Sequence, residues 1–434
     1  MHRAITLGSV LATLWSGALG AQGTAPWQEP PSDTTALTVD EARRLALHQN
    51  PALLADLQRL GAAAADLRTA QTYPFNPALE IEAPGSFTDR TDDRYEIRLG
   101  QDIEWAGQRG LRIDAAEAGV TAAQAGALDD VRVVLADVER TWFSLASAGR
   151  RLAVATDIRM LNDRLLDAVR VQLAEGEVSL LQANLLEIEA ARARARVLAA
   201  HREVVEAELA LIRLTGLPAS STVRAVGIDS VDSNWGPSAS LPELSLFALD
   251  HRPDLLAARA GVDRAESLRS LATREALPNV RISGIADREG TGAPTRFGLA
   301  LTVPVPLFDR NQGPRARRVV EANGAAMTVE ATELRVRTEV ADAYRAWQAA
   351  GQEVGLFERG VVAPARENQQ LLETAYQEGK LDLATLLLLR NQLLDAEMGY
   401  WDAWERQHHA EVALRSATAI LLADIDLDLL ETSR

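Results

Sequence analysis

The chain repeats itself at a spacing of about 200 residues. Residues 46–55 (ALHQNPALLA) reappear as residues 248–257 (ALDHRPDLLA), which is a shift of 202 positions. Residues 175–180 (EGEVSL) reappear as residues 378–383 (EGKLDL), which is a shift of 203 positions. Two distant segments that recur in the same order at nearly the same shift predict a tandem duplication.

The repeat predicts how the chain of 434 residues is divided. We expect a first repeat at 37–218 and a second at 241–422, joined by a Ser-, Gly- and Asp-rich loop at 219–240. Inside the repeats we expect strands at about 78–105 and 279–307, and long helices at about 106–215 and 312–422. The remaining segments are a signal peptide at 1–20, a loose tail at 21–36 and a C-terminal tail at 423–434.

Each repeat contains a heptad pattern typical of long, paired helices. Apolar residues alternate spacings of four and three, as the a and d positions of a coiled coil do. In the first repeat these positions are Leu186, Ala190, Ala193, Val197, Ala200, Val204, Ala207, Leu211 and Leu214. Their counterparts 203 positions later are Leu389, Leu393, Ala396, Tyr400, Ala403, Gln407, Ala410, Leu414 and Ala417, of which only Gln407 is polar. No proline interrupts residues 106–175, so this helix can reach on the order of 100 Å. An ordinary buried helix bundle is the alternative, but it does not explain why the pattern survives the shift.

Each repeat also contains two candidate strands. Residues 95–105 and 297–307 alternate apolar with polar or small residues over a length typical of a tilted membrane-spanning strand. Their partners are residues 78–83 and 280–285, with hairpin loops at 85–93 and 288–294. Soluble hairpins that cap a helical bundle are the alternative. Four strands cannot close a barrel, so strands that enter lipid require several copies of the chain.

The start of the chain predicts export. His2 and Arg3 precede an apolar run from Ala4 to Trp15 and a small-residue stretch that ends near Gly20, which is the pattern of a cleavable signal peptide. An N-terminal membrane anchor is the alternative, although the run is short for that role. The chain contains no cysteine, so a lipid anchor on cysteine is not expected. The net charge of −16 argues against a nucleic-acid partner.

Several motifs resemble the TolC-type outer-membrane efflux factors over almost the whole expected mature chain. Asn50-Pro51 and Arg252-Pro253-Asp254 resemble the junctions between the short helices of that family, and Leu277-Pro278-Asn279 resembles its entry into a strand. Gly176 and Gly379 resemble the glycines at the turns between its long helices. The resemblance implies a mainly α fold with membrane β-strands. It further implies a homotrimer in the outer membrane, with a shared twelve-stranded barrel and a coiled-coil tunnel in the periplasm.

Two stretches resemble the cation-efflux, CzcC-like branch of this family. They are residues 100–109 (GQDIEWAGQR) and residues 303–313 (VPVPLFDRNQG). The resemblance implies passive conduction of divalent heavy-metal cations, with a periplasmic adaptor protein and an inner-membrane, proton-driven pump of the RND type as partners. A drug- or protein-exporting channel of the same fold is one alternative. A periplasmic coiled-coil scaffold outside the membrane is another.

The resemblance also assigns candidate functional residues. The adaptor would dock at the helical tips, which comprise Gly176, Glu177, Val178, Gly379, Lys380 and Leu381. The candidate tunnel entrance comprises Gln182, Leu185, Asp382, Thr385 and Leu388. Familiar members carry an acidic ring at the positions of Thr385 and Leu388, so that ring is not expected here. Acidic residues at the start of a helix, such as Asp382, are also ordinary partners of the helix dipole.

No motif predicts catalysis, a cofactor or a metal centre. His408 and His409 are adjacent in a predicted helix, whereas two ligands on one face need a spacing of four. Asp424, Asp426 and Asp428 lack the glycine and the final glutamate of a calcium loop. No phosphate loop, hydrolase elbow or HExxH sequence is present. We therefore expect a protein that is not an enzyme.

Overall fold

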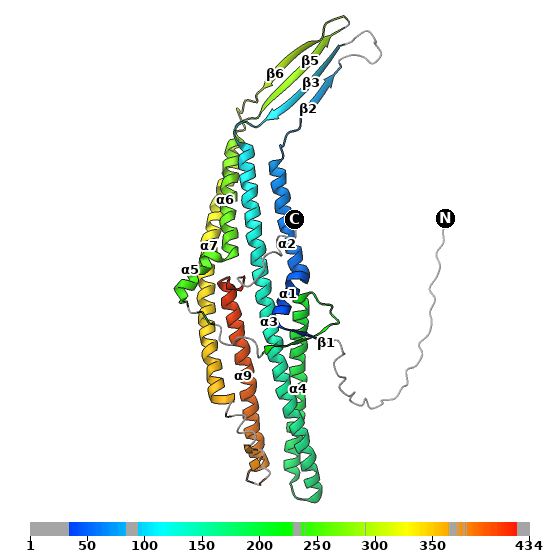
Figure 1. The fold of residues 1–434 in the computed structure, drawn as a ribbon, viewed down its shortest axis with the longest axis vertical. Helices are drawn as coiled ribbons and strands as arrows, with labels where there is room; N and C mark the ends of the chain where they lie inside the picture. The colour runs from blue at the N-terminus through cyan, green and yellow to red at the C-terminus, as the bar shows by residue number, and fades with distance from the viewer. Residues whose placement is uncertain are drawn as a thin grey trace, which may run out of the picture.

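The computed structural model is a long, narrow molecule with a β-sheet at one end and helices along the rest of its length (Figure 1). It describes residues 34–83, 94–228, 236–237, 239–290, 292–362, 364, 371–372, 374–375, 378 and 380–422. The predicted signal peptide, most of the predicted N-terminal tail, the loop at 85–93, Gly379 and the C-terminal tail lie outside the described residues.

The order of elements in the first half of the chain recurs in the second half. The first half contains α1 (Val39–Gln49), α2 (Pro51–Gln71), β2 (Ala78–Glu82), β3 (Arg94–Ile103), α3 (Gln108–Glu175) and α4 (Leu180–Thr215). The second half contains α5 (Leu241–His251), α6 (Pro253–Arg274), β5 (Val280–Glu289), β6 (Arg296–Thr302), α7 (Gln312–Phe357), η2 (Glu358–Val362), α9 (Leu383–Ala417) and η3 (Ile420–Leu422). The fold is therefore a tandem repeat of two short helices, two strands and two long helical segments.

Prolines mark the junctions between the short helices. Pro51 and Pro253 each occupy the first position of a helix, where the missing N–H group costs no hydrogen bond. The side chain of Asn50 accepts hydrogen bonds from the backbone N–H groups of Ala52 (2.9 Å) and Leu53 (3.2 Å). The sequence around residue 50 therefore ends α1 and starts α2 within one residue.

The four strands at the end of the molecule form one antiparallel sheet in the order β2-β3-β5-β6. The central pair, β3 and β5, comes from different halves and is in register from Arg94 opposite Glu289 to Ile103 opposite Val280. The sheet therefore joins the two repeats by backbone hydrogen bonds. β5 extends through Glu289, two residues into the loop predicted at 288–294.

The last strand is shorter than the alternation predicted. The sequence pattern runs to Leu307, but β6 ends at Thr302. Pro304 and Pro306 follow, and neither has the backbone N–H group that a ladder needs. The expected strand over 297–307 was therefore wrong in its second part.

A small two-stranded sheet occupies segments predicted to be irregular. β1 (Thr34–Leu37) pairs in parallel with β4 (Thr222–Ala225). β1 includes the end of the predicted loose tail, and β4 lies inside the predicted loop at 219–240. The indole of Trp142 on α3 donates a hydrogen bond of 2.9 Å to the carbonyl of Leu37, which fixes β1 against the long helix. Four-residue strands paired across the chain leave no periodicity for sequence analysis to detect.

The predicted heptad positions are buried where the long helices pack. Leu186, Ala190 and Ala193 of α4 are almost completely buried against α3. The largest apolar cluster lies near the middle of the molecule, where α3 meets α9 and α1, and includes Trp142, Phe143 and Trp404. This cluster is the main core, and it joins the two halves.

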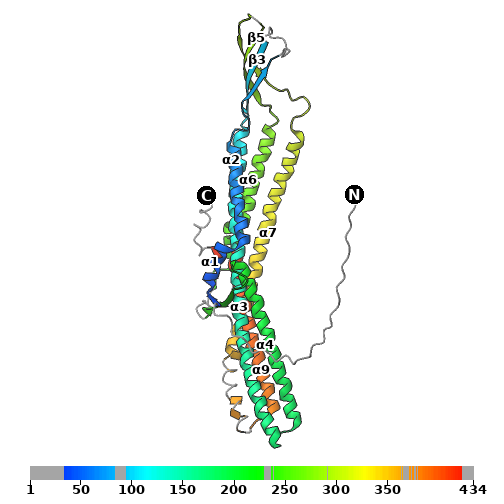
Figure 2. The same ribbon diagram turned by 90° about the vertical axis from the view of Figure 1, so that its right-hand side faces the viewer.

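The helix predicted from residue 312 is interrupted. α7 ends at Phe357 and continues as η2, a π-helical turn, whereas α3 runs for 68 residues without a break (Figure 2). Pro364 follows η2; its ring excludes a regular α-helical bond to the carbonyl of Gly360. The two long helical segments of the repeats therefore differ in continuity.

Candidate functional site

One face of the four-stranded sheet is apolar and exposed. The paired register places Leu79 beside Leu99, and Ile282 beside Leu301. The face comprises Leu79, Ile81, Ile97, Leu99, Ile282, Phe297, Leu299 and Leu301. Phe297 and Leu299 are 84% and 86% exposed, so the described residues of one copy leave this surface uncovered.

The opposite face is polar and contains several ion pairs. Arg281 on β5 binds Asp102 on β3 through two hydrogen bonds of 2.8 and 2.9 Å. Arg98 on β3 lies 2.5 Å from Glu96 and 3.6 Å from Glu80. The sheet therefore separates an apolar surface from a charged one, as a strand that divides lipid from water does.

The outer strands each have one neighbour. β2 pairs only with β3, and β6 only with β5, within the part of the chain that the structure describes. The other backbone edge of each strand lacks a strand partner there. Such an edge is a template for pairing with another chain.

The first helical tip lies at the far end of the molecule from the sheet (Figure 1). α3 ends at Gly176, whose φ of 78° lies in the left-handed region that favours glycine. The N–H of Glu177 bonds to the carbonyl of Gln172 at 2.9 Å, and the N–H of Gly176 bonds to Leu173 at 3.1 Å. This pair of bonds is the Schellman motif, which ends the helix and reverses the chain.

The second tip repeats this arrangement. The N–H of Lys380 bonds to the carbonyl of Ala375 at 2.8 Å, and Asp382 caps α9 by accepting the N–H of Thr385 at 2.6 Å. That hydrogen bond holds the pKa of the Asp382 carboxyl below its ordinary value. Lys380 forms an ion pair of 2.5 Å with Glu378 and remains largely exposed. Gly379, which the sequence analysis assigned to this tip, is not among the described residues.

The residues predicted for a tunnel entrance have different local roles. Gln182 forms a capping box with Ser179 at the start of α4, and Thr385 contributes its backbone to the cap of α9. Leu185 and Leu388 are exposed in one copy of the chain. The structure therefore places all of these residues, together with Asp382, within the first turns of the helices that start at the tips.

Sequence reasoning missed an exposed apolar pair beside the first tip. Leu180 and Leu181 are 64% and 68% exposed. They follow the capping residue Ser179 directly and lie outside the heptad pattern, which is the signal that could have identified them.

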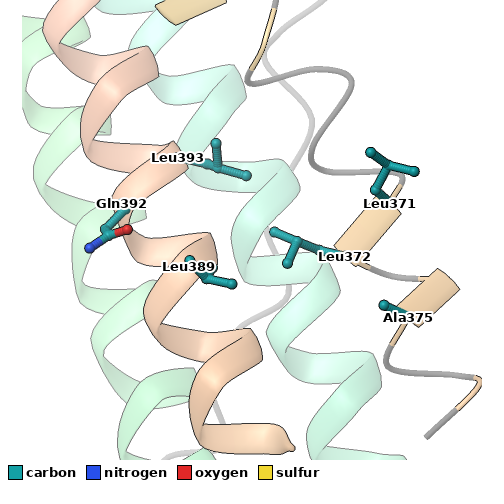
Figure 3. A pocket seen from close by; sticks show the side chains of 6 residues that line it. All are labelled: Leu371, Leu372, Ala375, Leu389, Gln392 and Leu393. Atoms are coloured by element: carbon teal, nitrogen blue, oxygen red, sulfur yellow. The ribbon is translucent and has the colours of Figure 1, made fainter. Parts of the chain in front are cut away.

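A pocket of about 420 Å³ opens between the second tip and α9 (Figure 3). Apolar side chains predominate among the described residues that line it, which are Leu371, Leu372, Ala375, Leu389, Gln392 and Leu393. Leu372 and Leu389 point toward one another across it. The pocket shows that the packing between these segments is loose near the tip.

A buried carboxylate links the two halves near the middle of the molecule. Glu139 on α3 pairs with Arg43 on α1 and with Arg415 on α9, the latter at 3.0 Å. Burial raises the pKa of Glu139, and the arginines oppose that shift. The site binds the last long helix to the first half.

The two adjacent histidines have separate partners. The ring of His408 stacks on Phe143 at 4.4 Å, whereas His409 contacts the Ser144 hydroxyl at 3.1 Å and the Arg140 carbonyl at 3.0 Å. Burial lowers the pKa of His409, and Glu405 partly opposes that shift. Among the described residues there is no group of three or more His, Asp or Glu side chains that could hold a metal ion.

None of the described helices combines sufficient length with sufficient apolarity to cross a bilayer.

The fold and its two-faced sheet define a family of channel proteins. The family model for outer membrane efflux proteins matches residues 42–217 and 245–419, so both halves of the chain belong to it. The chain is thus a member of the outer membrane efflux protein family, whose members are channels rather than enzymes.

The chain is similar to two curated relatives and to one solved structure. It is 25% identical over 368 residues to the cobalt-zinc-cadmium resistance protein CzcC of Cupriavidus metallidurans, covering 84% of this chain and 85% of that protein. It is 24% identical to the nickel-cobalt-cadmium resistance protein NccC of Alcaligenes xylosoxydans xylosoxydans, covering 72% and 69% of the two chains. Its fold matches the channel CusC with a TM-score of 0.72 at 18% identity, covering 91% of this chain and 95% of that one.

Proposed function

We propose that this protein is the outer-membrane channel of a tripartite efflux system and that it conducts divalent heavy-metal cations passively to the exterior. The observation that carries the channel assignment is the sheet with one exposed apolar face, one ion-paired face and two edges that pair with no other strand of the described residues. Family membership supports efflux. The relatives CzcC and NccC, both named for resistance to divalent metals, support the cargo.

The channel requires more than one copy of the chain. Backbone groups at an open sheet edge cannot be satisfied in lipid, so β6 of one copy must pair with β2 of the next. Three copies with four strands each supply twelve strands, an even number within the range of membrane barrels. The apolar face would then contact lipid and the ion-paired face would line the pore.

The helical body would extend into the periplasm as a tunnel. In this orientation the tips at Gly176–Val178 and at residues 380–381 lie farthest from the membrane. We assign them to docking with a periplasmic adaptor, which connects the channel to an inner-membrane, proton-driven pump of the RND type. The exposed leucines at 180 and 181 supply an apolar contact beside the first tip.

The protein would reach the outer membrane after export. The charged start and short apolar run of the sequence support a cleavable signal peptide, and the absence of cysteine argues against lipidation.

The cargo is tested in a strain that lacks this gene. We expect sensitivity to zinc, cobalt and cadmium to rise several-fold, while sensitivity to drugs and detergents stays at the parental level. Complementation with the intact gene should restore growth. Sensitivity to drugs alone would instead assign the channel to drug export.

Membrane location is tested by fractionation. We expect the mature protein to sediment with the outer membrane and to resist extraction by high salt. Recovery as a free periplasmic protein would contradict the channel assignment and support the alternative, a coiled-coil scaffold outside the membrane.

Docking is tested at the second tip. We expect Gly379→Val to impair metal resistance while the assembled oligomer survives, because a bulky β-branched residue cannot follow a tight turn. Gly61→Val, at a site on α2 where an added Cβ meets nothing within 4 Å, is the matched control. Normal resistance in the Gly379 variant would remove the docking assignment.

A further inference from the structure

An apolar stretch continues below the sheet, where the strands meet the long helices. We call Val303, Val305, Leu307 and Phe308 the junction belt. Their side chains are 47%, 73%, 65% and 91% exposed, although they no longer belong to β6. The prolines between them keep this stretch out of the ladder, so its apolar side chains need a partner other than the sheet.

The first half contributes a counterpart at the same level. Trp105 follows β3 and is 58% exposed, while its indole N–H donates a hydrogen bond of 2.9 Å to the Pro278 carbonyl. The polar atom of the ring is therefore satisfied inside the protein, and its apolar body faces outward. Trp residues in this position are typical of the boundary between lipid and water.

Arginines without acidic partners lie immediately beyond the belt. Arg310 donates to the Pro306 carbonyl at 3.3 Å, and Arg109 donates to the Gln71 carbonyl at 2.7 Å. Within the described part of the chain, Arg109 and Arg310 do not pair with a carboxylate. The same holds there for Arg315, which lies on the first turn of α7. The neighbouring Arg112, Arg317 and Arg318 all do, with Glu104 or Glu321.

Few acids offset this charge. Asp309 accepts the backbone N–H of Asn311 at 2.9 Å, and Glu275 lies 3.5 Å from the Asn311 amide. The exposed apolar side chains of the belt and these arginines therefore lie next to each other along the chain. The combination fits an amphiphile with a negatively charged head.

We propose that the junction belt, with Arg310 and Arg315, binds anionic phospholipids of the leaflet that faces the periplasm. The inference rests on the proposed channel function, which places the sheet in the membrane and the helices in the periplasm. The acyl chains pack against Val305, Leu307 and Phe308, in continuity with the apolar face of the sheet. The guanidinium groups reach the phosphate, which they can hold through two parallel hydrogen bonds. Bound lipid thus sets the depth at which the channel sits.

Lipid-dependent thermal stability tests the proposal. The full-length channel is purified in a neutral detergent, its conductance is verified in a planar bilayer, and phosphatidylglycerol or phosphatidylcholine is added. We expect phosphatidylglycerol to raise the Tm by about 3 °C more than phosphatidylcholine does. The double variant R310Q/R315Q should lose this difference. The matched variant R196Q/R213Q, which removes two exposed arginines of α4, should keep it.

Two outcomes would overturn the proposal while leaving the channel assignment intact. The first is an equal response to phosphatidylglycerol in the parent and in R310Q/R315Q, with normal conductance in both. The second is equal stabilisation by inorganic phosphate in phosphatidylcholine micelles, which would assign the arginines to free anions. A preparation that neither conducts nor associates with lipid contradicts the proposed function itself.

Insertion depth supplies a second measurement that does not depend on stability. The chain has no cysteine, so F308C can carry a single spin label. In phosphatidylglycerol vesicles we expect the label to be accessible to oxygen and shielded from a water-soluble nickel complex, unlike a label at R196C. Equal exposure of both labels to nickel would place the belt in water and overturn the proposal.

Discussion

The long helical segments of the two halves start in the same way and continue differently. α3 runs unbroken from the sheet to the first tip, whereas α7 gives way to the π-helical turn η2 after 46 residues. A π-helical turn is rare and is frequently found at functional sites. The first half therefore contains a continuous long helix, whereas the long helical segment of the second half is interrupted, and both halves share one sheet and one core.

The ion pairs of Glu139 connect α3 to the second half, so breaking them tests whether the halves are held as one unit. Glu139→Ala removes the buried carboxylate that Arg43 and Arg415 share, and it leaves the two positive charges near each other. We expect a loss of about 3–5 kcal/mol in the free energy of unfolding, measured by urea denaturation in detergent. Glu206→Ala removes an exposed carboxylate on α4 and should change stability by less than about 0.5 kcal/mol. Similar losses in both variants would deny Glu139 its linking role.

A proline introduced into α3 would give the first half the interruption that the second half already has. Met160 is 44% exposed, so replacing it disturbs little packing. We expect Met160→Pro to cost about 3 kcal/mol and to abolish efflux, because α3 no longer fixes the position of its tip. Met160→Ala keeps the helix and should behave like the parent. Full efflux by Met160→Pro at parental abundance would show that continuity of α3 is dispensable.

A substitution in the turn at the first tip should have a smaller effect on stability. Gly176 adopts a positive φ, and a Cβ added there meets no atom within 4 Å, so the cost of Gly176→Val comes from backbone conformation alone. We expect a destabilisation of roughly 1–2 kcal/mol, confined to the tip and visible as faster amide exchange near residues 170–182. Gly126→Val, on the helical part of α3 with equally open surroundings, separates this effect from the added side chain. Unchanged exchange at the tip would contradict the argument.

The contact of His409 on α9 with α3 should give a weak pH dependence. Burial lowers the pKa of His409 in the folded state, so the unfolded chain takes up a proton first as the pH falls. The stabilising contribution is therefore present above the ordinary histidine pKa of about 6.5 and is lost as the pH falls through the folded value. We expect the free energy of unfolding to vary less with pH in His409→Gln than in the parent between about pH 7.5 and 5. The difference should be only a few tenths of a kcal/mol, because the His409 side chain is partly screened by solvent. His48→Gln on α1 is the control, and a parental profile in His409→Gln would exclude this contribution.

Much of the fold could be predicted from the sequence because the patterns that indicate it are local and occur once in each repeat. Alternation over residues 95–103 predicts which side of β3 is apolar, and the heptad positions from Leu186 onward predict which side of α4 is buried. The same patterns recur about 200 positions later, so the repeat can be detected from the sequence. Alternation alone does not predict where β6 ends, because Pro304 and Pro306 lack the backbone N–H groups that a strand ladder needs even though the apolar pattern continues past them.

The remainder depends on contacts between distant segments. The pairing of Thr34–Leu37 with Thr222–Ala225 joins two short strands that carry no pattern of their own. The association of Glu139 with Arg43 and Arg415 requires the relative rotation of three helices, which periodicity does not provide. The tips were predicted as turns from their glycines, and the structure adds that Gln182 and Asp382 serve as caps. Docking and conduction at these residues remain predictions.

The end of α9 meets arginines from both halves of the chain. Arg132 on α3 donates to the carbonyl and the hydroxyl of Ser416 at 3.1 and 2.9 Å, and Arg252, from the start of α6, reaches the Ala417 carbonyl at 3.4 Å. Both arginines are almost completely buried. A chain that stops before α9 would lack these carbonyl acceptors, and the two arginines would keep only their carboxylate partners, Asp129 for Arg132 and Asp254 and Glu339 for Arg252. The last long helix therefore completes the hydrogen bonding of buried groups that earlier parts of the chain supply.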